Sequence, residues 1–198
     1  MFNNENKIYF YKLIMSLKKG NQKSAELNTS EDFQVNESLL KIINKILSIV
    51  IKENKNLRNY EEKKTLQKNM SFNSNKKPSL SIKDYLYRIQ NYTEAEDNTL
   101  IIALMYIDRL SQISSIILTP YNIHRILFVS VLLAIKYNED VCFGFDFYAK
   151  IAGVPIKELK KMESDFVYLI KFKFYINKEE FEKYKLYIED IEYDDVKN

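Results

Sequence analysis

Cysteine and histidine are almost absent from this sequence. Cys142 is the only cysteine and His124 the only histidine among 198 residues. One chain therefore cannot assemble a disulfide framework or a zinc cluster of Cys and His ligands, and a Ser-His or Cys-His catalytic pair could use only His124. The Asp-x-Asp-x-Asp-Gly spacing of a calcium loop is also missing. We therefore expect no metal ion, no cofactor and no catalytic residue.

Glycine and proline are also scarce, with three of each. A turn-rich β fold usually contains many more, whereas a composition dominated by Leu, Ile, Lys, Glu and Tyr favours long helices. Because 46% of the residues are apolar, the chain can bury one core of ordinary size. These features predict an all-α protein with a single globular domain.

Long apolar runs are missing as well. The longest, Leu100–Ile107 and Ile126–Ile135, are far shorter than the roughly 18 residues that span a bilayer. Residues 1–10 are polar and rich in Asn, unlike a secretory signal. We therefore expect an intracellular protein, cytoplasmic or nuclear, that does not enter a membrane.

The charges that are present are unevenly distributed. The net charge is +3, but residues 1–79 hold 15 Lys and Arg against 8 Asp and Glu, and residues 80–198 hold 15 against 19. The two parts thus carry +7 and −4. No dense Lys and Arg block with interleaved aromatic residues occurs in the basic part, so the pattern does not favour nucleic-acid binding.

The apolar residues recur at helical spacing along most of the chain. After Pro78, every Pro and Gly falls between periodic segments. Thr93 and Glu96 have the spacing of a capping box, and Thr119 followed by Pro120 is a typical helix start. The pattern predicts helices over residues 36–55, 81–92, 93–111, 119–137, 145–151, 155–172 and 177–190.

These patterns divide the chain into five segments. Residues 1–32 are expected to form a partly disordered arm, residues 33–56 a helix that precedes the main domain, and residues 57–78 a polar linker rich in Asn and Lys. Residues 79–190 are predicted to form the helical domain and the helix that follows it, and residues 191–198 a short acidic tail.

Three charged residues interrupt apolar helix faces. Asp108 lies in the strongly apolar helix predicted over residues 93–111, where an unpaired carboxylate is costly, so we expect it to be buried and paired. Arg88 and Arg109 are its candidate partners. Lys136 ends one apolar helix, and Glu163 lies on the apolar stripe of another. Their spacing alone fits a surface ion pair, side chains that extend to solvent, or a polar clamp within an apolar docking patch.

The order of several sequence blocks suggests a family. Over residues 72–187, seven blocks follow one another: Pro78–Ile89, Ala103–Leu110, Leu118–Arg125, Ala134–Asp140, Tyr148–Val154, Glu158–Glu163 and Phe181–Tyr184. In this order they resemble the helices of a cyclin box of the P/U type, the group that includes the yeast phosphate-signalling cyclin. The predicted helix over residues 36–55 resembles the helix that these cyclins carry before the box. Residues 1–32 and the linker have no counterpart in this resemblance.

The resemblance implies an all-α fold: a single five-helix cyclin box with an extra N-terminal helix and a short C-terminal helix. It also implies a regulatory subunit, not an enzyme, whose partner is a cyclin-dependent protein kinase bound through the third and fifth helices of the box. Lys136 matches the lysine of the Ala-x-Lys-Tyr motif, and Glu163 matches the glutamate of the fifth helix. The apolar kinase-binding positions around them match Leu133, Val167, Phe172 and Phe174.

One departure from the family concerns the first helix of the box. Cell-cycle cyclins carry there a substrate-docking motif of the Met-Arg-Ala-Ile-Leu type, and its arginine pairs with the aspartate that matches Asp108. This chain has Ser79-Leu-Ser-Ile82 instead, so we expect that docking mode to be absent and Arg88 to pair with Asp108. A cyclin-fold adaptor without kinase activation, or an interaction module like those of transcription factors, remains the alternative reading.

Overall fold

The computed structural model describes residues 35–114 and 116–196, and these residues form eight helices and no strand. This result confirms the predicted all-α fold. The expected arm at residues 1–32 lies outside the described residues. The helices are α2 (Glu37–Lys55), α3 (Tyr60–Leu66), α4 (Ile82–Thr93), α5 (Asp97–Ile113), α6 (Ile123–Asn138), α7 (Phe145–Ala152), α8 (Ile156–Leu169) and α9 (Lys178–Val196).

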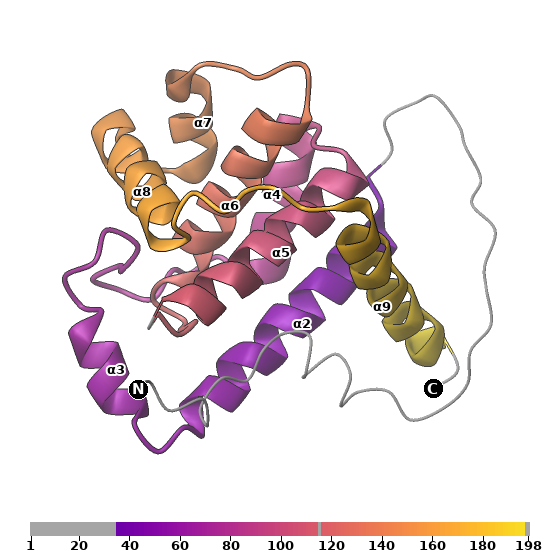
Figure 1. Ribbon diagram of the computed structural model, residues 1–198. Helices are drawn as coiled ribbons and strands as arrows, with labels where there is room; N and C mark the ends of the chain where they lie inside the picture. The colour runs from indigo at the N-terminus through magenta and orange to yellow at the C-terminus, as the bar shows by residue number, and fades with distance from the viewer. Residues whose placement is uncertain (1–34, 115, 197–198) are drawn as a thin grey trace.

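Helices α5 and α6 form the centre of the molecule and pack against each other (Figure 1). Every residue from Ile126 to Ile135 on α6 is buried, as expected for a helix that is apolar all round. Helices α7 and α8 pack on one side of this pair, and α9 packs against α5 and α2 on the other. The five helices α4 to α8 correspond to the predicted box, and α2 is the predicted preceding helix.

Two helix starts differ from the prediction. Thr93 does not open α5: it ends α4, where its hydroxyl donates to Ile89 O, and Glu94 follows in the left-handed conformation with φ of 52°. Thr119 and Pro120 form a turn before α6 instead of its first residues. In this turn Asn122 Oδ1 accepts a hydrogen bond from Thr119 N at 2.8 Å. Ser, Thr and Asn serve turns and helix starts equally well, so spacing could not decide between them.

The segment at residues 57–78 is not a simple linker, and that prediction was wrong. It contains α3, and Phe72 is only 2% exposed because its ring packs edge-on against Phe166 of α8 at 6.1 Å. Arg125 of α6 donates hydrogen bonds to Ser71 O and Asn73 O. A buried aromatic residue thus anchors a segment whose average composition is polar, together with hydrogen bonds from Arg125, from Asn122 to the buried Gln67, and from Ser74 N to Tyr121 O.

The C-terminal helix is longer than predicted. Helix α9 continues to Val196, and Ile191 is buried, so residues 191–196 are not a separate tail. Ile191 extends an apolar stripe at helical spacing that begins at Tyr184 and includes Tyr187 and Ile188. The high density of acidic residues in this part of the sequence concealed that stripe.

Candidate interaction face

An ion pair joins the end of α6 to the middle of α8. Lys136 Nζ lies 2.5 Å from Glu163 Oε1, and the two side chains are 26% and 18% exposed. Lys136 is in the last turn of α6, where a cation is favoured by the helix dipole, and α6 packs against α8. The two residues that the sequence singled out are therefore brought together on a partly exposed surface.

An aromatic ring from a third helix completes this pair. Lys136 Nζ lies 4.1 Å from the centroid of the Phe145 ring at the start of α7, and Lys160 Nζ of α8 lies 5.2 Å from it. A cation over a ring face is attracted by the ring quadrupole. The ring also restricts the Lys136 side chain. Sequence analysis missed Phe145. The only hint in the sequence was that this aromatic residue follows Gly144 directly and begins a predicted helix.

The apolar residues predicted around the ion pair divide into two groups. Val167 is half-buried, and Phe172, just beyond α8, is 64% exposed with its ring 5.7 Å from that of the exposed Tyr168. Leu133 and Phe174, in contrast, are buried. The expectation that Leu133 flanks the pair at the surface was wrong, because that position of α6 points into the core.

Phe174 contributes to the surface only through a neighbour. Its ring stacks on that of Tyr137 at 4.3 Å, with 12° between the ring planes, and meets the ring of Tyr106 edge-on at 5.4 Å. Tyr137, next to Lys136, is itself exposed. We call the surface made by Lys136, Tyr137, Phe145, Glu163, Val167 and Phe172 the α6–α8 face. Sequence analysis missed Tyr137.

Several large apolar side chains are exposed in the part of the chain that includes this face. Ordinary surfaces expose such residues singly, and a group of them is typical of interaction sites. In the described residues, the exposed large apolar side chains between residues 137 and 175 are Tyr137, Val141, Phe143, Ile156, Tyr168, Phe172 and Tyr175. The α6–α8 face thus combines a shielded ion pair with exposed aromatic surface, which suits contact with another protein more than chemistry on a small molecule.

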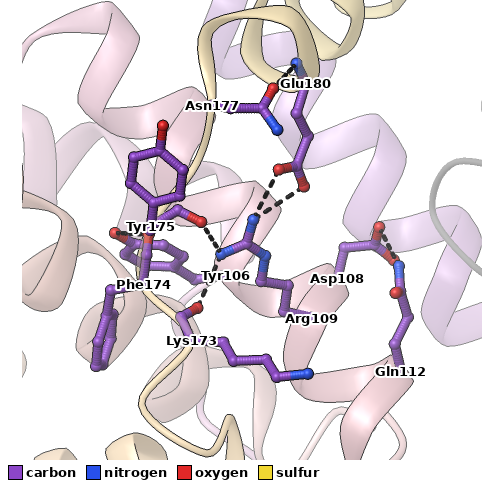
Figure 2. Close-up of polar contacts among 9 residues, drawn as sticks. All are labelled: Tyr106, Asp108, Arg109, Gln112, Lys173, Phe174, Tyr175, Asn177 and Glu180. Atoms are coloured by element: carbon purple, nitrogen blue, oxygen red, sulfur yellow. Dashed lines mark hydrogen bonds and ion pairs between the residues drawn. The ribbon is translucent and has the colours of Figure 1, made fainter.

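The predicted pair of Asp108 and Arg88 does not form. Asp108 is buried as predicted, but its carboxylate accepts a hydrogen bond from Gln112 Nε2 at 2.8 Å (Figure 2). Arg88 is exposed and donates to Lys150 O of α7 at 3.0 Å. Asp108 instead faces α9, where burial and, to a smaller extent, its charge hold the pKa of Tyr184 well above the usual value.

Two further features of the described residues bear on chemistry: the grouping of metal-binding side chains and the setting of the single histidine. Within the part of the chain that the structure describes, no three His, Cys, Asp or Glu side chains are grouped as a metal site requires. The His124 ring lies against that of Tyr85 at 5.1 Å, and its Nε2 is 2.8 Å from Leu80 O, which is a structural arrangement. None of the described helices is long and apolar enough to cross a membrane.

The comparison with known proteins decides the family. A family model described as Cyclin matches residues 16–174, which is most of the chain. This chain belongs to the cyclin family. Membership in this family supports a regulatory role.

Plant cyclins of the P and U types are among the similar proteins, as the sequence blocks indicated. The chain is 37% identical to Cyclin-U4-2 of Arabidopsis thaliana over 103 residues, which are 52% of this chain and 48% of that protein. It is 33% identical to Cyclin-U2-2 of Arabidopsis thaliana over 123 residues, with 62% and 54% covered. Cyclin-P3-1 of Oryza sativa subsp. japonica is 33% identical over 118 residues, with 60% and 50% covered. The chain spans about half the length of these curated relatives.

Proposed function

We propose that this cyclin binds a cyclin-dependent protein kinase through the α6–α8 face and activates it. The observation that carries the proposal is the ion pair between Lys136 and Glu163. The two charges are half-buried, with the Lys136 ammonium over the Phe145 ring, and they add little to stability because a partly exposed pair contributes about 0–1 kcal/mol. Such a pair is better suited to recognise polar groups of a partner than to hold the fold together.

The composition of the face fits a helix-binding surface. Phe172 and Tyr137 offer apolar area that gains free energy when a partner helix covers it. Lys136 and Glu163 remain able to hydrogen-bond backbone carbonyl and amide groups of that partner, because each side chain still has accessible surface. The apolar contacts would supply most of the affinity, and the charged pair would fix the position of the partner helix along the face.

Activation would follow from position alone. A kinase is competent when a lysine of its N-lobe pairs with a glutamate of its regulatory helix, which requires that helix to be held inward. If the α6–α8 face binds the inward position more tightly than the outward one, the population shifts to the active state. The cyclin itself would carry out no chemical step.

The test compares two ion pairs that both include a residue of α8. Lys136→Ala breaks the proposed clamp, whereas Lys161→Ala breaks the exposed pair of Lys161 and Asp165, which also has a 2.5 Å separation. The kinase that the wild-type chain recovers from a native lysate is purified, and its affinity and its ATP-dependent phosphorylation of a peptide substrate are measured with each variant.

We expect Lys136→Ala to weaken kinase binding by roughly 30-fold to several hundred-fold, since truncating a desolvated interfacial charge costs about 2–4 kcal/mol. Lys161→Ala should bind within about twofold of the wild type. Melting temperatures of both variants should stay close to that of the wild type. Equal affinities of all three chains would refute the proposed face, and binding without stimulated phosphorylation would favour an adaptor.

A further inference from the structure

The segment that links α8 to α9 carries part of the exposed aromatic surface. We call residues 170–177 the strap. It presents Phe172 and Tyr175, two of the most exposed aromatic side chains of the described residues. Lys171 and Phe172 both have positive φ, 54° and 58°, a conformation that residues other than glycine seldom adopt. The strap therefore needs contacts from outside itself to keep this shape.

These contacts come from α5. The carbonyls of three consecutive strap residues accept hydrogen bonds from its side chains (Figure 2). Arg109 Nη1 donates to Lys173 O and to Tyr175 O, both at 2.8 Å, and Tyr106 Oη donates to Phe174 O at 3.2 Å. A segment outside helices and strands must satisfy its carbonyls in some other way, and here one helix satisfies three in a row.

The same arginine also holds the start of α9. Arg109 Nη2 lies 2.9 Å from both carboxylate oxygens of Glu180, in the first turn of that helix (Figure 2). The amide of Glu180 in turn donates to Asn177 Oδ1 at 2.7 Å, at the end of the strap. One guanidinium thus connects α5, the strap and α9.

We propose that Arg109 is a positioning residue: it fixes the strap so that Phe172 and Tyr175 face a partner, and it couples α9 to the α6–α8 face. The effect on partner binding rests on the proposed function, whereas the effect on the strap does not. Arginine is required because its planar fork presents several N–H donors in fixed directions, while a lysine ammonium cannot reach two carbonyls and a carboxylate in this arrangement.

The first test examines the free protein. Amide hydrogen exchange of the full chain is followed by mass spectrometry in peptides that cover residues 170–177 and residues 126–135, for the wild type and Arg109→Lys. We expect exchange in the strap to become at least tenfold faster and exchange in residues 126–135 to stay unchanged. Arg88→Lys is the matched control, because Arg88 also donates to a backbone carbonyl, that of Lys150.

A second variant separates the ion pair of Arg109 with Glu180 from its hydrogen bonds to the strap carbonyls. Glu180→Gln removes the charged partner in α9 but leaves both carbonyl bonds of Arg109, so it should accelerate strap exchange by about threefold. Unchanged strap exchange in Arg109→Lys would overturn the proposal. Equal loss of protection in the strap and in residues 126–135 would also overturn it, since Arg109 would then support the whole fold.

The binding test uses the kinase that the wild-type chain recovers. If an open strap only lowers the competent fraction of the cyclin, Arg109→Lys should reduce the association rate constant by about tenfold and leave the dissociation rate constant within twofold. An unchanged association rate despite an open strap would overturn the positioning role. If Lys136→Ala also fails to affect binding, the proposed kinase face is wrong, and the exchange result for the strap still stands.

Discussion

Helices α6 and α8 lie side by side but present different surfaces. Along α6, every residue from Ile126 to Ile135 is buried, and accessible side chains resume only at Lys136 and Tyr137. Along α8, only Leu159, Met162 and Phe166 are buried, and the other residues remain at least partly accessible. The composition of α6 is thus explained by packing alone, whereas the exposed aromatic residues Tyr168, Phe172 and Tyr175 on and beyond α8 are not. This difference is the basis for proposing a partner.

The largest expected difference in the free energy of unfolding is between two phenylalanine variants, one in buried α6 and one on the exposed surface beyond α8. Phe128 on α6 is buried, with its ring 6.4 Å from that of Tyr85, so Phe128→Ala should lower the free energy of unfolding by about 3–5 kcal/mol. Phe172→Ala on the α6–α8 face should cost about 0.5 kcal/mol. Urea unfolding of both variants measures the difference. Similar losses would mean that Phe172 is a structural residue and would remove the contrast between the two surfaces.

The segment at residues 57–78 offers a second, smaller contrast. If Phe72 anchors this segment to α8, Phe72→Ala should cost about 3 kcal/mol, the lower end of the range for a buried Phe, because the surrounding chain can rearrange. Met70→Ala, two residues away and exposed, should cost about 0.5 kcal/mol. Thermal melts of the two variants provide the measurement. Equal melting temperatures would restore the view of this segment as a linker without fixed packing.

The order and type of the helices could be predicted from the sequence, because periodicity and the placement of Pro and Gly report directly on local structure. The exact ends of the helices were harder to predict. Thr93 and Thr119 both carry hydroxyls that can serve either a cap or a turn, and the choice depends on neighbours such as Asn122 that are brought close only by the fold. Phe72 was missed for a related reason: a single apolar residue has no period, and only its contact with Phe166 gives it a role.

The α6–α8 face could be predicted in part. Lys136 and Glu163 were recognisable because charges interrupted apolar stripes and matched a family motif. Leu133 and Phe174 were matched to kinase-binding positions by the same family pattern but are buried. Leu133 points into the core because packing sets the rotation of α6 about its axis, and the Phe174 ring packs against Tyr106 and Tyr137. The partner of Asp108 was predicted on another helix, yet Gln112 lies one turn away on the same helix and provides a donor.

The smallest expected effect concerns the single histidine on the α4 side of α6. His124 Nε2 faces Leu80 O, and a carbonyl can only accept, so the neutral ring carries its proton on Nε2. Nδ1 is buried with no hydrogen-bond partner among the described residues. Protonation would place a second N–H there without an acceptor. Burial first, and the nearby positive charge of Lys77 in addition, lower the pKa of His124 below its usual 6.5, although backbone contacts at Leu80 and Ser81 oppose this shift.

A lowered pKa in the folded state determines the sign of the pH effect. The unfolded chain binds the proton first as the pH falls, so the stability associated with neutral His124 is complete above the unfolded pKa of about 6.5 and is lost as the pH falls through the folded pKa. One proton limits the slope to about 1.4 kcal/mol per pH unit. His124→Gln keeps a donor for Leu80 O and does not titrate, so the free energy of unfolding of the wild type minus that of the variant, measured in urea from pH 8 to pH 5, isolates this group. We expect that difference to be flat above about pH 7.5 and to decrease below 6.5, whereas a difference that is constant over the whole range, or that increases on acidification, would show that His124 has the same proton affinity in both states or a higher one in the fold.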